Sequence, residues 1–426
     1  MERKADRVIF HVDVNSAFLS WEAVYRLAHL GGRQDLRNEV SAVGGDMAMR
    51  HGIILAKSIP AKKYGIRTGE TILEARRKCP DLILVPPNYG LYERCSRAFM
   101  EILRQYSPSV EQYSIDEAFV DMTGTGGLWG EPAAAAGRLR EQIKRELGFT
   151  VNIGISDRKL LAKMASDFQK PDRVHTLWHT EIVDKMWPLP VEDLFFVGPA
   201  AARKLHTLGI CTVGQLAGAD PALLKLHLKK QGEVVWGFAN GRDVSVVQAE
   251  PPANQGYGNS TTIAFDVADA STARLVLLGL AETVGARLRA AGVRAEVIAV
   301  GIKSHDLQYA SRQITLGNAT NITSEIHRYA CQIFGSLWDG RPIRHLGIRT
   351  GRLKDGAAMR QMELFETADY GKLERRDAAV DQIRRRHGID AVRRAPFLQK
   401  GLRIDHMEGG ISREKRSVDY RKIDVK

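Results

Sequence analysis

Two apolar segments that each carry carboxylates near one end constrain this chain most. Residues 8–14 (VIFHVDV) bear Asp13, and residues 112–121 (QYSIDEAFVD) set the adjacent pair Asp116 and Glu117 between apolar flanks. Such runs predict short buried strands. Acids on strand ends can gather two Mg²⁺ ions about 4 Å apart, which activates an attacking oxygen and steadies a leaving phosphate. An isolated Asp-Glu pair after a strand is more often a solvated turn, so the surrounding residues must decide.

The composition indicates a globular protein with a polyanionic partner. The 426 residues leave room for about two to four domains and a substantial buried core. Hydrophobic residues make up 44% of the chain and charged residues 26%, which is ordinary for a globular fold. The net charge of +12 favours nucleic acid over an anionic membrane as the partner. On charge alone, a basic protein without such a partner is the alternative.

The cysteines and the N-terminal residues exclude several protein classes. The four cysteines are widely spaced and form no CxxC pair, so we expect neither a zinc site nor a disulfide framework. The first residues are charged and no long apolar stretch follows them. We therefore expect no signal peptide, no membrane partner and a cytoplasmic location.

The two acidic segments resemble the catalytic motifs of a known polymerase family. Residues 8–14 are followed by Asn15-Ser-Ala-Phe18, and the second segment contains Ser114-Ile-Asp-Glu117. These motifs are similar to those of the Y-family (translesion) DNA polymerases of the DinB branch, bacterial DNA polymerase IV. The resemblance covers about the first 350 residues, with the motifs in the expected order. It implies an α+β multidomain fold, a right-hand polymerase with a palm, small fingers, a helical thumb and a βαββαβ little finger.

The resemblance also implies a division of the chain into domains. The expected parts are residues 1–30 (palm, first part), 31–75 (fingers), 76–170 (palm, second part), 171–242 (helical thumb with a helix–hairpin–helix), 243–252 (linker), 253–353 (little finger) and 354–426 (C-terminal tail). The alternation of strand and helix patterns in the first 170 residues fits an α+β palm. Residues 253–353 show a strand, helix, strand, strand, helix, strand pattern.

By this resemblance, Asp13, Asp116 and Glu117 hold two Mg²⁺ ions per active site, with the backbone carbonyl of Val14 as a further ligand. The implied activity is template-directed addition of dNTPs to a primer 3′-OH by two-metal-ion nucleotidyl transfer, in DNA damage tolerance and repair. The implied partners are primer–template DNA and dNTPs, and we expect a monomer. The chain departs from the usual Asp-x-Asp pattern because Asn15 replaces the second acid, which should not abolish metal binding.

Two further residues match positions that contact the incoming nucleotide. Phe18 aligns with the steric gate, the bulky side chain under the sugar that rejects a ribose 2′-OH. Residues 160–171 (LLAKMASDFQKP) are similar to the family's most recognisable block, and by that match Lys170 contacts the β- and γ-phosphates. A lysine there neutralises charge on the leaving pyrophosphate. The alternative for Phe18 is an ordinary core residue.

The expected fingers are small, and they depart from the family at one nucleotide contact. Leu55 and Ala56 match residues that lie over the nascent base pair. The family commonly has Tyr-x-x-Arg in the following short helix, where this chain has Ile59 and Lys62. Lys62 is carried over as a phosphate contact, although it is a point charge and not a bidentate arginine. The alternative for Lys62 is a solvated surface lysine. Ile59 is not expected to contact the nucleotide.

The helix–hairpin–helix of the thumb is expected to bind the DNA backbone. Residues 194–205 and 208–216 match its two helices, with Gly198 in the hairpin, where backbone N–H groups bind phosphate without reading sequence. The usual hairpin begins Gly-x-Gly, and here Phe196 replaces the first glycine. A plain helical linker is the alternative.

The C-terminal tail contains one apolar pentapeptide, residues 361–365 (QMELF). It resembles the peptide with which bacterial polymerases bind the β sliding clamp. Leu364 and Phe365 would enter an apolar pocket while Gln361 fixes the register. Residues 373–389 are predicted to form an arginine-rich helix, which is either solvated or in nonspecific contact with DNA.

Two other functions remain open at this point. A non-catalytic homologue would bind DNA and the clamp, although it would be expected to lack the carboxylates that this chain retains. A metal-dependent nuclease would use the same acids but would leave Phe18 and Lys170 without roles. No segment reads as a proofreading exonuclease, so we expect low fidelity.

Overall fold

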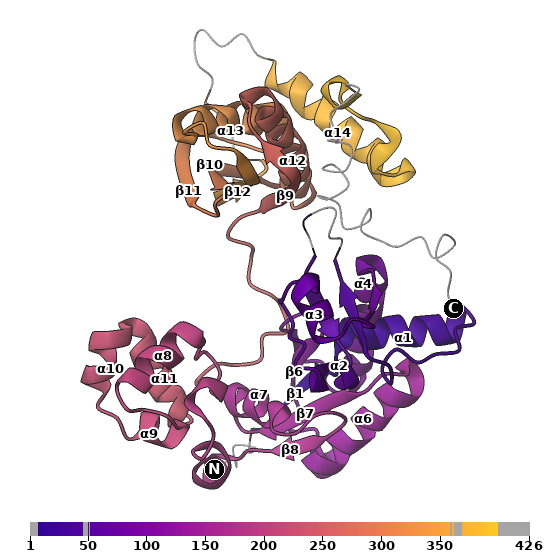
Figure 1. Cartoon of the computed structure of the whole chain (residues 1–426), viewed down its shortest axis with the longest axis vertical. Helices are drawn as coiled ribbons and strands as arrows, with labels where there is room; N and C mark the ends of the chain where they lie inside the picture. Colours follow the sequence, from indigo (N-terminus) through magenta and orange to yellow (C-terminus); the bar gives the residue numbers. More distant parts are fainter. Residues whose placement is uncertain (1–6, 46–49, 51, 358–359, 362–368, 399–426) are drawn as a thin grey trace.

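A computed structural model of the protein describes residues 7–45, 50, 52–357, 360–361 and 369–398. These residues form three β-sheets and an additional helical unit, and the parts are arranged as Figure 1 shows. The sheets have five, four and three strands. None of the helices in this part of the chain is both long and apolar enough to cross a membrane.

The palm is a five-stranded sheet with helices on both faces. Its strand order is β5-β6-β1-β7-β8. The strands are β1 (Ile9–Val14), β5 (Val110–Gln112), β6 (Glu117–Asp121), β7 (Val151–Ser156) and β8 (Val174–Thr176), and the main helices are α1 (Ala17–His29), α4 (Tyr89–Tyr106), α6 (Pro132–Leu147) and α7 (Lys159–Asp167), with the single turn α5 (Gly126–Trp129) before α6. Phe10 and Val12 of β1 pack with α4 and α6, whereas Ile9 packs with Ala162 of α7 on the opposite face. The central strand β1 is therefore buried on both faces.

A close approach between β7 and α7 depends on Gly154. A Cβ atom at this position would lie 1.9 Å from the carbonyl oxygen of Ala162 and 2.5 Å from the backbone nitrogen of Ser166. Both atoms belong to the backbone of α7, so they cannot move aside as a side chain can. Gly154 therefore sets how closely α7 lies against the sheet.

We predict that Gly154→Ala destabilises the palm by about 3 kcal/mol or more, because the added methyl group must displace α7. The matched control is Gly137→Ala in α6, where an added Cβ meets nothing within 4 Å. That change should raise stability by about 0.5–1 kcal/mol, because alanine favours the helix. Chemical denaturation of both variants measures the difference, and equal midpoints would contradict the account of Gly154.

The fingers are a small three-stranded sheet with two short helices. The elements are β2 (Ser41–Gly44), β3 (Ile54–Lys57), α2 (Ile59–Lys63), α3 (Ile72–Lys78) and β4 (Ile83–Val85). The strand order is β3-β2-β4, and β4 runs parallel to β2. This sheet therefore extends beyond residue 75, the boundary expected from the sequence, because its third strand returns only after α3.

The thumb is helical, as expected. Its helices are α8 (Pro199–Thr207), α9 (Val213–Ala217), α10 (Pro221–Leu228) and α11 (Lys230–Ala239), after short turns at His179–Glu181, Ile182–Met186 and Val191–Asp193. Leu160 and Leu161 of α7 belong to the same hydrophobic cluster as these helices. At its start, however, the expected thumb range includes β8, which pairs with β7 in the palm sheet.

The first residues of the expected linker, residues 243–248, pack along the palm. The carboxylate of Asp243 accepts the backbone N–H of Leu160, 2.9 Å away, near the start of α7. Glu111 accepts the backbone N–H of Gln248 at 2.7 Å and also contacts Lys159. These bonds fix the first residues of the linker on the palm before the chain continues toward the next sheet (Figure 1).

The little finger has the expected βαββαβ order. Its elements are β9 (Gly258–Val267), α12 (Ala270–Ala290), β10 (Val293–Ser304), β11 (Tyr309–Thr320), α13 (Thr323–Leu337) and β12 (Ile343–Asp355), and its strand order is β11-β10-β12-β9. α12 and α13 cover one face of the sheet, where the core lies (Figure 1). On the other face, Ser260, Gly301, Ser311 and Gly347 form one row of paired positions across the four strands. The ring of Tyr309 lies over Gly301, where an added Cβ atom would be 2.5 Å from the tyrosine hydroxyl. Among the described residues, no helix covers this face, which we call the open face of the sheet (Figure 1).

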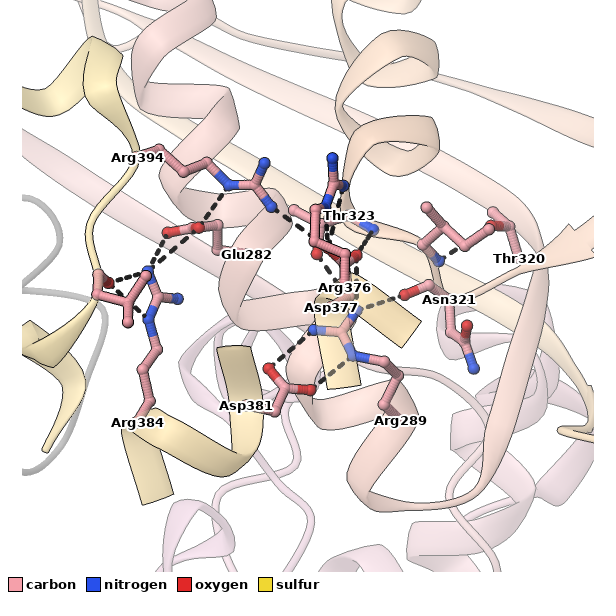
Figure 2. A network of polar contacts seen from close by, with 12 residues as sticks. Glu282, Arg289, Thr320, Asn321, Thr323, Arg376, Asp377, Asp381, Arg384 and Arg394 are labelled. Atoms are coloured by element: carbon pink, nitrogen blue, oxygen red, sulfur yellow. Dashed lines mark hydrogen bonds and ion pairs between the residues drawn. The ribbon is translucent and has the colours of Figure 1, made fainter. Parts of the chain in front are cut away.

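The predicted arginine-rich helix exists as α14 (Tyr370–His387), and it is docked on the little finger. Asp377, on α14, accepts the backbone N–H of Thr323 at 2.8 Å and so caps the start of α13, which has no side-chain cap of its own. Arg289 of α12 forms ion pairs with Asp377 and Asp381 (Figure 2). The C-terminal region is thus in part an additional layer of the little finger and not only a polar tail.

Candidate active site

The strand pairing of the palm brings the three predicted acids together. Asp13 of β1 lies directly opposite Glu117 of β6 in the antiparallel register. The backbone N–H of Val14 donates to the carbonyl oxygen of Asp116 at 3.0 Å. Residues directly opposite in such a pair have Cβ atoms about 5 Å apart. Asp13 and Glu117 therefore lie on the same face of the sheet, near the end of β1 and the start of β6.

Glu117 is held by two cationic or hydrogen-bonding groups from other elements. His11 Nε2 lies 3.0 Å from Glu117 Oε2, and Lys163 of α7 forms an ion pair with the same carboxylate oxygen. Burial alone raises the pKa of Glu117, but the hydrogen bonds from His11 and Lys163 outweigh it and lower that pKa to about 2. Burial lowers the pKa of His11, so its ring is neutral near pH 7. Glu117 is therefore ionised.

Asp13 has a different environment. Burial raises the pKa of Asp13 above its usual value, and the ion pair with Lys170 only partly opposes this shift. The negative charge of Asp116 raises that pKa further. Lys170 also pairs with Asp167 at 2.8 Å and keeps 37% of its side-chain surface exposed. Asp13 is thus a partly buried acid that is stabilised by positive charge beside it.

The donor set suits a hard divalent cation, although the side chains do not surround a cation position. The described residues contain no group of three or more His, Cys, Asp or Glu side chains already placed to hold a metal ion. Instead, lysine ammonium groups contact Asp13 and Glu117, where they act as stand-in cations. Carboxylate oxygens are the ligands that Mg²⁺ prefers, so exchange of lysine for metal fits the chemistry.

Asn15, the departure from the Asp-x-Asp pattern, is buried in a hydrogen-bond network. Its Oδ1 accepts from Thr150 Oγ1 at 2.9 Å and from the backbone N–H of Asp172 at 3.0 Å. Its Nδ2 donates to Asn152 Oδ1 at 3.1 Å. The amide therefore joins the end of β1 to β7 and to the turn just after Lys170. Its donor is used, which a carboxylate at this position could not supply.

Phe18 lies on α1, above an aromatic cluster. Its ring stacks on Tyr92 with a centroid distance of 4.3 Å and an interplanar angle of 13°, and Tyr89 approaches edge-on at 6.1 Å. The side chain is half-buried, so one side packs on the core and the other faces outward. The sequence left two roles open for Phe18, a steric gate or a core residue. The ring is packed on one side and exposed on the other, which is compatible with both roles.

The two residues of β3 that are expected to contact the nascent base pair pack in one hydrophobic cluster. Ala56 is buried in a cluster with Leu19 of α1, while Leu55 is only partly buried beside it. Lys62 is exposed on α2. Burial lowers the pKa of Lys57, and the nearby charge of Lys62 lowers it further. The fingers therefore carry two neighbouring lysines, and sequence reasoning missed Lys57.

The hairpin of the thumb keeps its backbone shape despite Phe196. Phe196 has φ = 75°, the left-handed conformation that glycine adopts most easily. Its side chain is 56% exposed and packs at its base against Phe195 and Phe238. Gly198 is exposed immediately before α8, where it is the N-cap. The aromatic contacts offset part of the cost of the left-handed residue.

The expected clamp peptide is only partly described. The backbone of Gln361 forms two hydrogen bonds with the side chain of Asn318 on β11, at 2.8 and 2.9 Å. Arg360, just before it, pairs with Glu325 of α13 at 3.0 Å. Leu364 and Phe365 lie outside the described residues.

Sequence reasoning missed the residues that hold the acids. His11 sits within the first motif and Lys163 within the block that ends at Lys170, but only the pairing of β1, β6 and α7 shows that both reach Glu117. His11 is 1% exposed. A polar residue inside an otherwise apolar strand was the available signal, because a buried polar group needs a partner.

Comparisons with known proteins identify relatives of this chain. Residues 12–167 match the impB/mucB/samB family, and residues 254–364 match the C-terminal domain of that family. DNA polymerase IV of Clostridium acetobutylicum is 44% identical over 395 residues, which is 92% of this chain and 99% of that protein. DNA polymerase IV of Acetivibrio thermocellus is 38% identical over 402 residues, which is 93% of this chain and 99% of that protein.

A solved structure has the same fold. A Y-family DNA polymerase chimera of Dbh and Dpo4 superimposes with a TM-score of 0.69 at 19% identity, covering 81% of this chain and 99% of that chain. The shared fold agrees with the α+β right-hand architecture expected from the sequence. Taken with the family matches over both ends of the chain, these results show that the chain belongs to the impB/mucB/samB family, in the DinB branch of the Y-family DNA polymerases.

Proposed function

We propose that this translesion DNA polymerase uses Asp13, Asp116 and Glu117, with the carbonyl oxygen of Val14, to hold two Mg²⁺ ions. The observation that carries the proposal is the register of β1 against β6, which sets Asp13 opposite Glu117 with Asp116 beside them. When bound, the ions would activate the primer 3′-OH and stabilise the charge on the triphosphate. The partly buried, oxygen-only donor set favours Mg²⁺ over softer metals.

The remaining residues of the site would position the nucleotide. Lys170 pairs with Asp13 and is partly exposed, so its ammonium group can move to the β- and γ-phosphates of an incoming dNTP. Lys62, exposed on α2 beside Lys57, would add positive charge at the fingers. Leu55 and Ala56 would contact the nascent base pair, and the hairpin at Gly198 would hold the DNA backbone.

Asp116→Ala should reduce primer extension by at least about a thousandfold, because removing one carboxylate leaves the site short of negative charge and of a ligand. Primer–template binding should change little. The measurement is extension of a defined primer–template with each dNTP and Mg²⁺. Asp184→Ala, which removes an exposed carboxylate in the Ile182–Met186 turn, is the control and should extend normally.

The same assay separates the other two functions. A non-catalytic homologue would bind primer–template without extension in the unaltered protein. A nuclease would shorten the DNA without any need for nucleotide. Full extension by Asp116→Ala would contradict the metal assignment and leave the polymerase activity itself intact.

We also propose that Phe18 is the steric gate. Its ring is fixed by stacking on Tyr92, so it cannot swing away from a ribose 2′-OH. Phe18→Ala should therefore raise ribonucleotide insertion relative to dNTP insertion by about 10- to 100-fold, the scale of discrimination by a steric pocket. Phe18→Tyr keeps the ring and should preserve the discrimination. Equal use of both nucleotides by the unaltered protein would exclude this role.

A β sliding clamp is the partner that we propose for residues 361–365, and we propose that the enzyme otherwise acts as a monomer. The backbone bonds of Gln361 to Asn318 support a fixed register at the start of this peptide. Phe365→Ala should weaken clamp binding by about 2 kcal/mol or more, as loss of a buried aromatic anchor does. Glu363→Ala, at the variable position of the peptide, is the control. Unchanged affinity of Phe365→Ala in a titration with purified clamp would remove the proposal.

Low fidelity without proofreading follows from the same architecture. The fingers are a three-stranded sheet with two helices of five and seven residues, which gives little surface to check the nascent pair. No domain beyond palm, fingers, thumb, little finger and the docked α14 is present among the described residues. We infer that damaged templates are accommodated at the cost of selectivity.

A further inference from the structure

The charges of α14 are sorted between its two faces. The helix has three acidic residues, and all three face the little finger, where they meet arginines. Glu374 pairs with Arg294 at 2.8 Å, and Asp377 and Asp381 pair with Arg289 at 3.4 and 2.6 Å. The acids of α14 are therefore neutralised on the docked face.

The docked face is fixed firmly, as Figure 2 shows. The Asp377 side chain is 1% exposed and bonds the backbone N–H of Thr323 at the start of α13. Arg384, further along α14, pairs with Glu282 of α12 at 3.3 Å and donates to the carbonyl oxygen of Val392 at 2.8 Å. Because these contacts are spread over several turns, α14 cannot rotate about its axis without breaking them. The direction of its other face is thereby determined.

The opposite face of α14 carries only positive charge. It comprises Lys372, Arg375 and Arg386, which are all exposed, and we call these three residues the α14 basic face. Arg385 is also exposed, but it is four residues after Asp381 and therefore lies beside the docked face. Arg375 and Arg386 are eleven residues apart, so at about 100° per residue they point in nearly the same direction, about 16 Å apart along the axis. Within the described residues, the two arginines of this face have no ion pair.

The arginines expected from the sequence to be solvated or to contact DNA thus divide into two groups. Arg384 forms an ion pair with Glu282, and Arg376 forms one with Asp377 at 3.1 Å. Both stabilise the docked helix. Arg375 and Arg386 add nothing to the docking, yet the helix holds them as one cationic surface with Lys372. A purely structural explanation covers the first group only.

We propose that the α14 basic face binds the phosphates of a DNA strand at a site separate from the primer–template site. The face is long enough to meet several phosphates, since each strand of a duplex carries one charge per about 3.4 Å. α14 packs on α12, and the helices α12 and α13 separate it from the open face of the sheet (Figure 1). A strand on α14 therefore cannot be the same as a duplex on that open face.

DNA fits this surface better than an acidic protein does. A protein partner needs apolar or aromatic anchors at the centre of its interface, and the outward side of α14 offers only Ala379 and Ile383, the latter 41% exposed. Phosphate binding needs no such anchor and depends on charge alone. The chain acts on DNA, so a second strand is available. This proposal does not depend on the assignments of metal, gate or clamp.

The test uses the full-length protein with its primer–template site occupied. The protein is saturated with an unlabelled hairpin primer–template, and a labelled 20-nucleotide single strand is then titrated at several salt concentrations. The double substitution Arg375→Glu/Arg386→Glu should weaken binding of the second strand at least tenfold at low salt. The slope of log K against log salt should become shallower by about 1.4, the value for two phosphates on a single strand.

A matched charge change elsewhere controls for the general field of the protein. Arg97→Glu/Arg104→Glu reverses two exposed arginines that lie on one face of α4 in the palm. This control should leave the affinity and the slope for the second strand unchanged. The neutral variant Arg375→Gln/Arg386→Gln should show the same change of slope with a smaller loss of affinity, which separates lost contacts from new repulsion.

Three outcomes would overturn the proposal. The first is a loss of second-strand binding in the α4 control equal to that in the α14 variant. The second is an unaltered protein that binds no second strand, which would make an acidic protein the class of partner to test. The third is a parallel loss of primer–template affinity in the α14 variant, which would show one DNA site and not two.

Discussion

The pairing of β1 with β6 in a single register is the constraint on which the rest of this structure depends. That register places Asp13 opposite Glu117 and brings Asp116 beside them. A slip by one residue would turn Asp13 to the other face of the sheet, because side chains alternate along a strand. The alternation is enforced from both sides, since Phe10 and Val12 are buried against α4 and α6, and Ile9 is buried against α7. The hydrophobic effect thus positions the charges.

Gathering three carboxylates has an electrostatic cost, and the neighbouring elements offset it unequally. Glu117 has both His11 and Lys163, and its pKa is lowered to about 2. Asp13 has Lys170, and burial still raises its pKa. α7 brings Lys163 and the turn with Lys170 to the site, and it can do so only because Gly154 lets it lie against β7. A backbone contact on the neighbouring strand, directly opposite His11, therefore controls the cations that face the acids.

Much of this organisation could be predicted from the sequence, and the failures have physical causes. The acids were identified because their motifs resemble those of a known family, since β1 and β6 have only six and five residues. The order of the little finger follows from local patterns, because its strands and helices are longer. The end of the fingers was misplaced because β4 joins its sheet by a parallel pairing after α3, which no local pattern records. The roles of His11 and Asn15 also escaped prediction, because each is defined by partners more than one hundred residues away along the chain.

The active site and the docked C-terminal helix both place an arginine or lysine beside an acid that is partly or fully buried, but for opposite purposes. The side chain of Asp377 is 1% exposed and accepts a hydrogen bond from a backbone N–H. Removing its partners would therefore leave a buried charge without compensation. Lys170 keeps 37% of its side chain exposed, so water can replace Asp13 as its neighbour at little cost. The two cations differ in their exposure. Arg289 is a permanent counter-ion that fixes α14, whereas the more exposed Lys170 can be exchanged for the cation that Asp13 binds.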